Sequence, residues 1–291
     1  MRLLVIGRSG QVALSLAERA TLHSSRPDVT CASRPDADLS VPATLDPLVD
    51  PERFDAVINA GAYTAVDVAE TDHAAAHALN ASGPGALAAL CAQRALPFIH
   101  ISTDYVFDGT GDRPHREDDP LNPQSVYGRT KAEGEAAVRE AGGRALIVRT
   151  AWVYSPFGKN FVKTMLRLGA TRPELKVVAD QHGNPTNALD LADALLSLAA
   201  SASEWPAEPD VVHAVGEGAT TWHAFACAAF DAARLTPTVH AITTAEFPTP
   251  ARRPANSRLD TAKLKARYGL ALPHWQESLP PVVARILADA P

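Results

Sequence analysis

The sequence predicts an α/β protein with a doubly wound parallel sheet and a smaller, loop-rich C-terminal lobe. In the first half, short and continuously apolar runs alternate with longer stretches of helical periodicity. Such runs are typical of parallel strands that helices cover on both faces, and repeated β-α-β units build a parallel sheet. The expected strands span 3–6, 29–32, 56–59, 98–102 and 145–149, and the expected helices span 11–23, 73–93 and 125–141.

The rhythm changes after about residue 150, which divides the chain into a sheet domain, 1–150, and a second part, 151–291. In the second part, prolines punctuate shorter elements. Helical patterns remain at 187–203, 222–234 and 274–289, and strand patterns at 211–215 and 239–242. Some of these segments are expected to return to the large sheet.

Composition excludes several classes of protein. The chain has 291 residues and a net charge of −6, which argues against a nucleic-acid binder because such proteins need a basic surface. No stretch approaches the roughly 20 apolar residues of a membrane span, and the first apolar run is too short for a signal peptide. Cys31, Cys91 and Cys227 form neither a zinc spacing nor a disulfide framework. We therefore expect a soluble, cytoplasmic protein without a membrane partner.

A glycine-rich turn, GRSGQVA at residues 7–13, follows the first expected strand. Gly7 and Gly10 permit a tight turn and close approach of the backbone to a diphosphate. Gln11 and Val12 open a helix whose positive end faces the anion. Although such a turn is common without a ligand, its position after the first strand predicts a Rossmann-type dinucleotide site.

The ends of the second and third strands bear on the choice of cofactor. Arg34 follows the second strand, where an arginine accommodates a 2′-phosphate and an acid usually holds the ribose 2′-hydroxyl. This favours NADPH as the cofactor. NADH stays open as an alternative, and so does a role of Arg34 as a solvated loop residue without a ligand. Asp38 and Leu39 are expected beside the adenine. The small residues after the third strand leave room for the cofactor, and Asn80 either braces that loop or is a helix-surface amide; the loop residues are Ala60, Gly61 and Ala62.

Three side chains predict acid–base chemistry. Thr103 ends the fourth strand, and Tyr127 and Lys131 are four residues apart, so they share one face of a helix. A nearby ammonium favours phenolate and would lower the pKa of Tyr127 from about 10. Thr103 would hydrogen-bond the same substrate oxygen, and Lys131 would also hold the nicotinamide ribose. A lone Tyr-x-x-x-Lys is usually surface decoration, but its order after the glycine turn and the threonine favours catalysis without a metal.

The segments STDYVFDG, YGRTKAEGE and RTAWVY resemble extended short-chain dehydrogenase/reductases that act on nucleotide sugars. Over almost the whole chain, the resemblance is greatest to dTDP-4-dehydrorhamnose reductases. It implies NADPH-dependent reduction of the 4-keto group of dTDP-4-dehydro-L-rhamnose to dTDP-L-rhamnose. It also implies that Thr103, Tyr127 and Lys131 are the catalytic residues.

Residues near these motifs suggest how the substrate is held. Nucleotide-sugar dehydratases usually carry an Asp-Glu pair after the threonine, whereas here Asp104 is followed by Tyr105, which favours plain reduction. Arg258 is expected to bind the substrate diphosphate, because guanidinium suits phosphate geometry. The other expected substrate contacts are Asp104, Trp152, Asn160 and Phe161.

Two alternatives and the oligomeric state stay open. The chain could act on another nucleotide-linked 4-keto sugar, as a reductase or epimerase. It could also be a non-catalytic nucleotide-binding subunit that resembles the regulatory subunit of methionine adenosyltransferase. Some family members dimerise around magnesium through acids near the first helix, but residues 13–17 contain none, and only Asp190 and Asp193 remain as candidates. We therefore expect a monomer or weak homodimer without bound metal.

Overall fold

The computed structural model describes residues 1–289 and confirms the predicted fold class. Its large sheet has six parallel strands in the order β10-β5-β4-β3-β1-β2. The strand order reverses direction between β1 and β3, as in doubly wound folds. The strands are β1 (Arg2–Ile6), β2 (Asp28–Ala32), β3 (Ala56–Asn59), β4 (Phe98–Thr103), β5 (Ala145–Thr150) and β10 (Asp210–His213).

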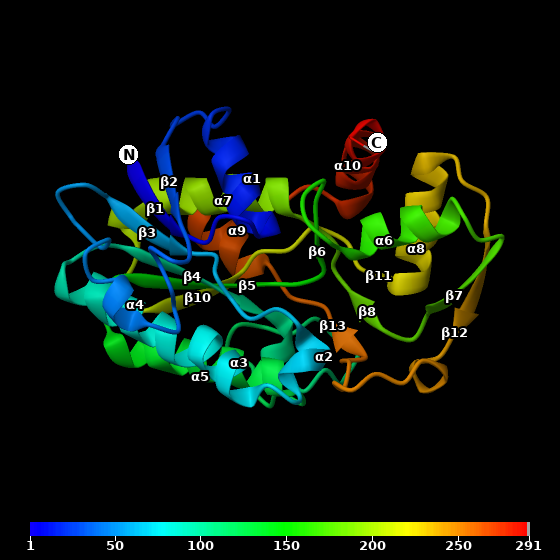
Figure 1. Cartoon of the computed structure of the whole chain (residues 1–291), viewed down its shortest axis with the longest axis horizontal. Coiled ribbons are helices and arrows are strands. Elements are labelled where there is room, and N and C mark those ends of the chain that lie inside the picture. Colours follow the sequence, from blue (N-terminus) through cyan, green and yellow to red (C-terminus); the bar gives the residue numbers. More distant parts are fainter. Residues whose placement is uncertain (290–291) are drawn as a thin grey trace.

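Helices cover both faces of this sheet, which explains the continuously apolar strands (Figure 1). Leu3 and Val5 of β1 pack on one side, against α1 (Gln11–Ala20), α7 (Ala188–Ala200) and α9 (Ala262–Tyr268). Leu4 and Ile6 pack on the other, where α4 (Gly83–Gln93) and α5 (Val126–Ala141) lie.

The expected helix over 73–93 is divided into three pieces. α3 (His73–His77) leads into a π-helical turn (Ala78–Ser82), and α4 follows. The turn packs closely against α5, because a Cβ on Gly134 of α5 would lie 2.0 Å from the Asn80 carbonyl oxygen. A π turn inside a helix often marks a functional position.

The second part of the chain builds a smaller lobe and also returns to the sheet. β10 pairs with β5, and α7 packs on α1, so these segments belong with the first 150 residues in space. The lobe has its own core around Phe225 and Trp275. The domain division at residue 150 stays a prediction. The remaining elements are α2 (Val66–Ala69), α6 (Phe161–Gly169), α8 (Trp222–Ala233), α10 (Trp275–Ala288), β6 (Val153–Tyr154), β7 (Glu174–Val178), β8 (His182–Gly183), β9 (Thr186–Asn187), β11 (Thr220–Thr221), β12 (Thr238–Ile242) and β13 (Asn256–Ser257).

Within residues 1–289, no helix combines the length and the apolar character that crossing a membrane requires.

Candidate active site

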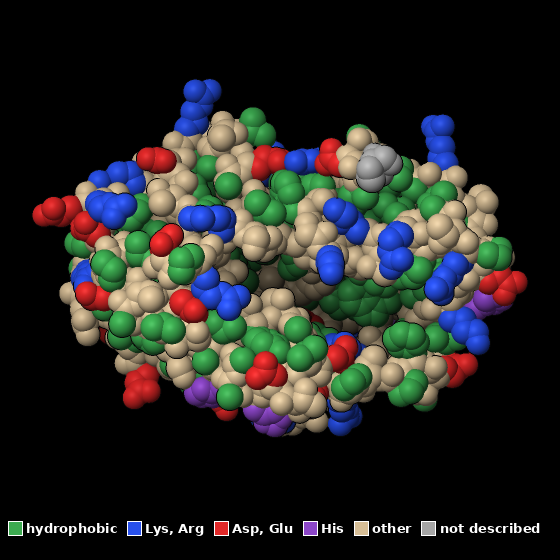
Figure 2. Space-filling model, in the orientation of Figure 1, with side chains coloured by type: hydrophobic (Ala, Val, Ile, Leu, Met, Phe, Trp, Pro, Cys, Tyr) green, Lys and Arg blue, Asp and Glu red, His purple; other side chains and the backbone are tan. Residues whose placement is uncertain are grey.

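A cavity of about 410 Å³ opens at the carboxyl edge of the large sheet, beside the ends of the neighbouring strands β1 and β3, where the strand order reverses. Ligands of open α/β sheets bind at this topological position. Figure 2 shows that the face of the molecule is hollowed between the sheet domain and the smaller lobe. The cavity is lined by the glycine turn, the ends of β3, β4 and β5, and one face of α5; among its residues are Gly10, Gln11, Val12, Ala60, Gly61, Ala62, Thr103, Asp104, Tyr127, Lys131 and Trp152.

The glycine turn is shaped to receive a diphosphate. Gly7 has φ +125°, a conformation that side chains disfavour, and a Cβ there would lie 3.3 Å from the Ala60 carbonyl carbon. Nothing lies within 4 Å of a Cβ built on Gly10, so the backbone there is open to a ligand. α1 begins at Gln11 without a side-chain cap, which leaves its first N–H groups available for an anion. These residues therefore fit the dinucleotide that the sequence predicts.

Two arginines lie near the end of β2: Arg34, which follows it in the chain, and Arg8, which reaches it from the glycine turn. Arg34 is exposed and lies outside the cavity lining. Arg8, which the sequence analysis passed over, is also exposed, and its Nη2 donates to the Cys31 carbonyl oxygen of β2 at 3.2 Å. The position of Arg8 inside the glycine turn was the sequence feature that could have indicated a role in cofactor binding. Both side chains therefore lie near the end of β2, where a 2′-phosphate would be held.

Asp38, Leu39 and Asn80 lie around the cavity without lining it. The Asp38 carboxylate accepts hydrogen bonds from the Ser40 hydroxyl (2.6 Å) and N–H (2.9 Å), which hold its pKa below the usual range. Leu39 is buried beside Gly61. Asn80 braces the loop after β3, since its side chain accepts from the Tyr63 N–H and donates to the Tyr63 carbonyl oxygen.

The structure brings Thr103, Tyr127 and Lys131 together in this one cavity. Ser125 caps α5 by accepting from the Gly128 N–H at 3.1 Å, so the helix begins just before Tyr127. The Thr103 hydroxyl lowers the pKa of the phenol and donates to Asp104 Oδ1 at 2.9 Å. Phenol, hydroxyl and carboxyl group therefore lie close together in the cavity lining.

The electrostatics of the phenol differ from the expectation. Lys131 Nζ donates to the Ile101 carbonyl oxygen at 2.6 Å, and burial lowers the pKa of this amine to about 8 against the opposing Glu135 carboxylate. Burial raises the pKa of Tyr127, and the Thr103 hydroxyl only partly offsets it. The expected lowering of the Tyr127 pKa by Lys131 is wrong for this structure, because desolvation raises this pKa and Lys131 is not among the groups that lower it. The phenol is consequently protonated at neutral pH and available as a proton donor.

Asp104 is buried beside these groups. Burial raises its pKa to about 6, against the opposing hydroxyls of Ser257 and Thr103. Its Oδ2 has no hydrogen-bond partner among the described residues. The site therefore contains a carboxyl group that titrates close to neutral pH.

A second cavity, of about 460 Å³, adjoins the first and shares Tyr105 and Trp152 with it. Most of its wall belongs to the smaller lobe, and five of its fifteen lining residues are aromatic. The apolar surface below α6 in Figure 2 lies in this part of the molecule. Positively charged groups stand at its border. Its lining includes Trp152, Phe161, Lys176, Gln181, Trp222, Phe247, Arg253 and Ser257.

Trp152 is held between the two parts of the molecule. Its ring stacks on Trp222 of α8 with centroids 3.5 Å apart and planes 8° from parallel. Gly183 lies against its edge, where a Cβ would come within 2.4 Å of the indole. Trp222 was not predicted as a site residue, because nothing in its local sequence connects it with a residue 70 positions earlier.

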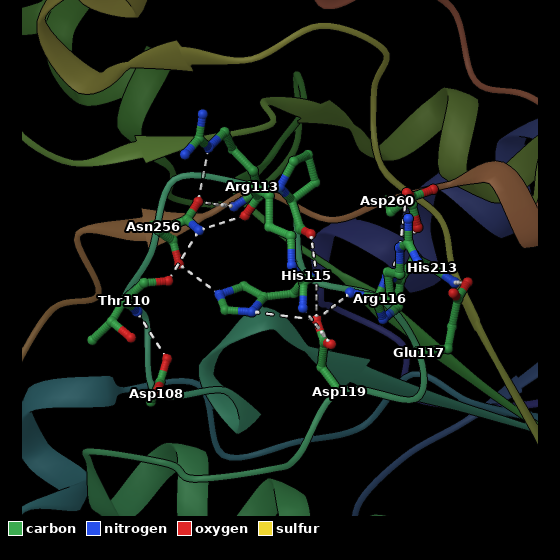
Figure 3. Close-up of polar contacts among 12 residues, drawn as sticks. Asp108, Thr110, Arg113, His115, Arg116, Glu117, Asp119, His213, Asn256 and Asp260 are labelled. Atoms are coloured by element: carbon green, nitrogen blue, oxygen red, sulfur yellow. Dashed lines mark hydrogen bonds and ion pairs between the residues drawn. The ribbon is translucent and has the colours of Figure 1, made fainter.

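Two expected substrate contacts lie elsewhere. The Asn160 amide is used inside the protein: it caps α6 by accepting from the Lys163 N–H, and it donates to Gln11 Oε1 at 3.0 Å. Arg258 donates to the Asn256 side chain at 2.8 Å and lines neither cavity. Figure 3 shows that Asn256 also donates to backbone carbonyl oxygens of the 110–113 loop. Residues 256–258 therefore anchor the segment 251–258 to this loop. Arg253, five residues earlier, is the arginine that reaches the second cavity.

Comparison with known proteins agrees with this geometry. The family model described as the RmlD substrate binding domain matches residues 1–288. A dTDP-4-dehydrorhamnose reductase from Sinorhizobium fredii is 44% identical over 99% of both chains.

The chain belongs to the dTDP-4-dehydrorhamnose reductase family.

Solved structures of that family have the same fold. The dTDP-4-dehydrorhamnose reductase of Clostridium acetobutylicum has a TM-score of 0.92 at 36% identity, covering 99% of this chain and 100% of that one. The Bacillus anthracis dTDP-4-dehydrorhamnose reductase, solved in complex with NADP, has a TM-score of 0.91 at 32% identity, covering 97% and 98%.

The acids considered for a metal-bridged family dimer have partners within this chain. Asp193 forms a bidentate ion pair with Arg19 of α1, with both contacts at 2.7 Å. Asp190 accepts from the Ser278 hydroxyl of α10. Both carboxylates therefore connect α7 to neighbouring helices of the same chain.

Proposed function

We propose that this chain reduces the 4-keto group of dTDP-4-dehydro-L-rhamnose with NADPH, giving dTDP-L-rhamnose, with Thr103, Tyr127 and Lys131 as catalytic residues. The observation that carries the assignment is their position in one cavity that begins at the glycine turn. Membership of the reductase family supports the substrate and the cofactor.

The residues of the cavity divide the chemistry as follows. Bound NADPH supplies the hydride that adds to the C4 carbonyl carbon. Tyr127 donates its proton to the oxygen as negative charge develops there, and its protonated state at neutral pH makes this proton available. The Thr103 hydroxyl, which lies beside the phenol, polarises the same oxygen. Lys131 holds the nicotinamide ribose and positions it against the phenol.

Arg8 and Arg34 are the proposed partners of the NADPH 2′-phosphate. Both are exposed cations near the end of β2, and Arg8 is oriented by its contact with Cys31. Exposed cations contribute modestly in water but select a phosphate over a hydroxyl at a defined position.

The second cavity is the proposed site of the dTDP group. Trp152, Phe161 and Trp222 offer flat apolar surface to a nucleobase, and Arg253 and Lys176 offer positive charge to the diphosphate. Arg253 is held in place by Asp67, at 2.6 Å, and by the Tyr105 hydroxyl, at 3.2 Å. The shared border places the sugar beside Tyr127.

Substitution of Tyr127 by Phe tests the mechanism. The variant keeps the aromatic packing but lacks the proton, so turnover should fall by roughly 10²–10⁴-fold while NADPH binding is retained. Turnover is measured as loss of NADPH absorbance with dTDP-4-dehydro-L-rhamnose, and binding as NADPH fluorescence. Unchanged turnover would remove Tyr127 from the mechanism.

A substrate panel distinguishes the remaining alternatives. Purified protein is incubated with NADPH and several nucleotide-linked 4-keto sugars, and each product is identified by NMR. We expect fastest oxidation with dTDP-4-dehydro-L-rhamnose and a single rhamnose product. Faster reaction with another sugar would indicate a different reductase, whereas no oxidation with any sugar would favour a regulatory subunit.

A further inference from the structure

His100 lies deep under the active site and faces Lys131. It belongs to β4 and is completely buried. On one side its ring is hydrogen-bonded to Asn59 of β3, with His100 Nδ1 3.1 Å from Asn59 Nδ2. On the other side, its Nε2 is 3.4 Å from Lys131 Nζ. Asn59, His100 and Lys131 form a buried row between the loop that follows β3 and α5.

The protons in this row can be placed from the hydrogen bonds at its outer end. Asn59 Oδ1 accepts from the Gly61 N–H at 3.1 Å, so the amide nitrogen is the end of Asn59 that faces His100. That nitrogen can only donate, and His100 Nδ1 must therefore accept. Burial, together with the adjacent Lys131 ammonium, holds the pKa of His100 well below its usual range. The neutral ring consequently carries its proton on Nε2 and directs an N–H at the amine.

We propose that His100 is a positioning residue for Lys131: fixed by Asn59, it presents an N–H and not a lone pair to the amine. An N–H so placed repels an ammonium and binds a neutral amine, whose lone pair can accept it. The contact therefore adds to burial in making the neutral amine accessible near physiological pH. Under the proposed function, this brings Lys131 close to the range in which acid–base groups work best.

Other charges around Lys131 act differently. Glu135, one turn later on α5, favours the ammonium, but its carboxylate is also bound by Arg149 of β5 and by the Ser102 hydroxyl. Tyr127 lies one turn earlier, and Asp104 follows β4. Two further acids are occupied elsewhere: Glu70, at the end of α2, accepts from the Val126 N–H, and Glu133 of α5 pairs with His77 at the surface. The sheet thus brings two groups to Nζ: the Ile101 carbonyl oxygen, which accepts from it at 2.6 Å, and the titratable ring of His100.

The test is a direct titration of Lys131 that needs no substrate. Protein is labelled with carbon-13 lysine, and the Lys131 Cε signal is assigned by its loss in Lys131→Met. In the unsubstituted protein we expect half-titration near pH 8. In His100→Gln the amide can turn its oxygen toward the ammonium, so the midpoint should rise by about one pH unit or more. An unchanged midpoint in a folded His100→Gln protein would overturn the proposal.

Two further variants make the test independent of folding problems at position 100. In Asn59→Asp the side chain keeps its shape, but a carboxylate oxygen accepts a hydrogen bond from His100 Nδ1–H. His100 Nε2 then presents a lone pair to Lys131, and the titration midpoint of Lys131 should also rise. Ile99→Val is the matched control, because Ile99 is equally buried but faces the opposite side of the sheet; its midpoint should not move. A rise in the control, or no rise in Asn59→Asp, would contradict the role assigned to His100. Because no sugar is used, the outcome is separate from failure of the proposed reaction.

Discussion

At the scale of single residues, the site depends on side chains that are buried and still polar. Tyr127 and Asp104 both have raised pKa values because the same desolvation acts on each. For the phenol the consequence is useful, since it keeps the proton that a ketone must receive. For the carboxyl the consequence is a cost in stability whenever Asp104 is ionised.

Replacing Asp104 by Asn should reveal that cost. The pKa of Asp104 is about 6 in the folded protein against an ordinary 3.8, so the favourable protonated state is present below 3.8 and is lost as pH rises through 6. The amide keeps the Thr103 contact without a charge. The variant should therefore be more stable near pH 8 by on the order of 3 kcal/mol, since each unit of the shift from 3.8 to about 6 is worth roughly 1.4 kcal/mol, and the gain should disappear near pH 4. Urea unfolding across this range measures it.

Asp108→Asn serves as the opposite control. The Thr110 N–H lowers the pKa of this partly exposed carboxylate, so removing its charge should not stabilise the protein at neutral pH. An Asp104→Asn gain of equal size at every pH would point to packing and contradict the electrostatic explanation.

At the scale of elements, the catalytic geometry depends on how closely α5 approaches its neighbours. Gly134 allows α5 to contact the π turn, and a Cβ at Gly128 would lie 2.2 Å from the Tyr105 carbonyl oxygen. Both glycines lie on the helix that carries Tyr127 and Lys131. Close packing at two points fixes the helix along its length and therefore fixes both side chains.

Gly134→Ala should destabilise the protein although alanine is the better helix former. The helix preference would favour the variant by roughly 0.5–1 kcal/mol, but the clash with Asn80 is overpacking that costs about 1–3 kcal/mol. We expect a net loss near 1 kcal/mol and reduced turnover, because α5 must move. Thermal unfolding and NADPH oxidation measure these effects. The neighbouring, exposed Glu133→Ala should change neither, and a stabilised Gly134→Ala would show that the helices separate freely.

The elements of the sheet could be predicted from the sequence, and the elements of the lobe only in part. The run at 98–102 lies within β4, which extends one residue further to Thr103; its apolar residues Phe98, Ile99 and Ile101 are the signal that predicted it. The five strands β6, β8, β9, β11 and β13 have two residues each and show no periodicity. The division of 73–93 was also invisible in the sequence; the π turn lies against Gly134, far along the chain, and no local pattern shows this contact.

At the scale of the whole molecule, the two cavities proposed to hold cofactor and substrate adjoin where the large sheet and the smaller lobe meet. The sequence predicted the sheet side of this junction, because glycines, Thr103 and Tyr127 stand in a recognisable order along consecutive elements. It predicted the lobe side less well. Three arginines occur within ARRPANSR, and their spacing does not tell which one faces the substrate. Asn256 captures Arg258, whereas Arg253 crosses to Asp67 and lines the second cavity.

This difference gives a matched set of variants for the diphosphate. Arg253→Met should raise the KM for the dTDP sugar by about 10-fold or more, because a charge-assisted contact is lost, while kcat changes less. Arg252→Met removes an exposed neighbour that donates to Gln124, and Arg258→Met removes the arginine held by Asn256. Steady-state NADPH oxidation should show nearly unchanged KM in both. If Arg258→Met alone raised KM, the diphosphate would lie beside Arg258 and Asn256, and the assignment of the dTDP group to the second cavity would be wrong.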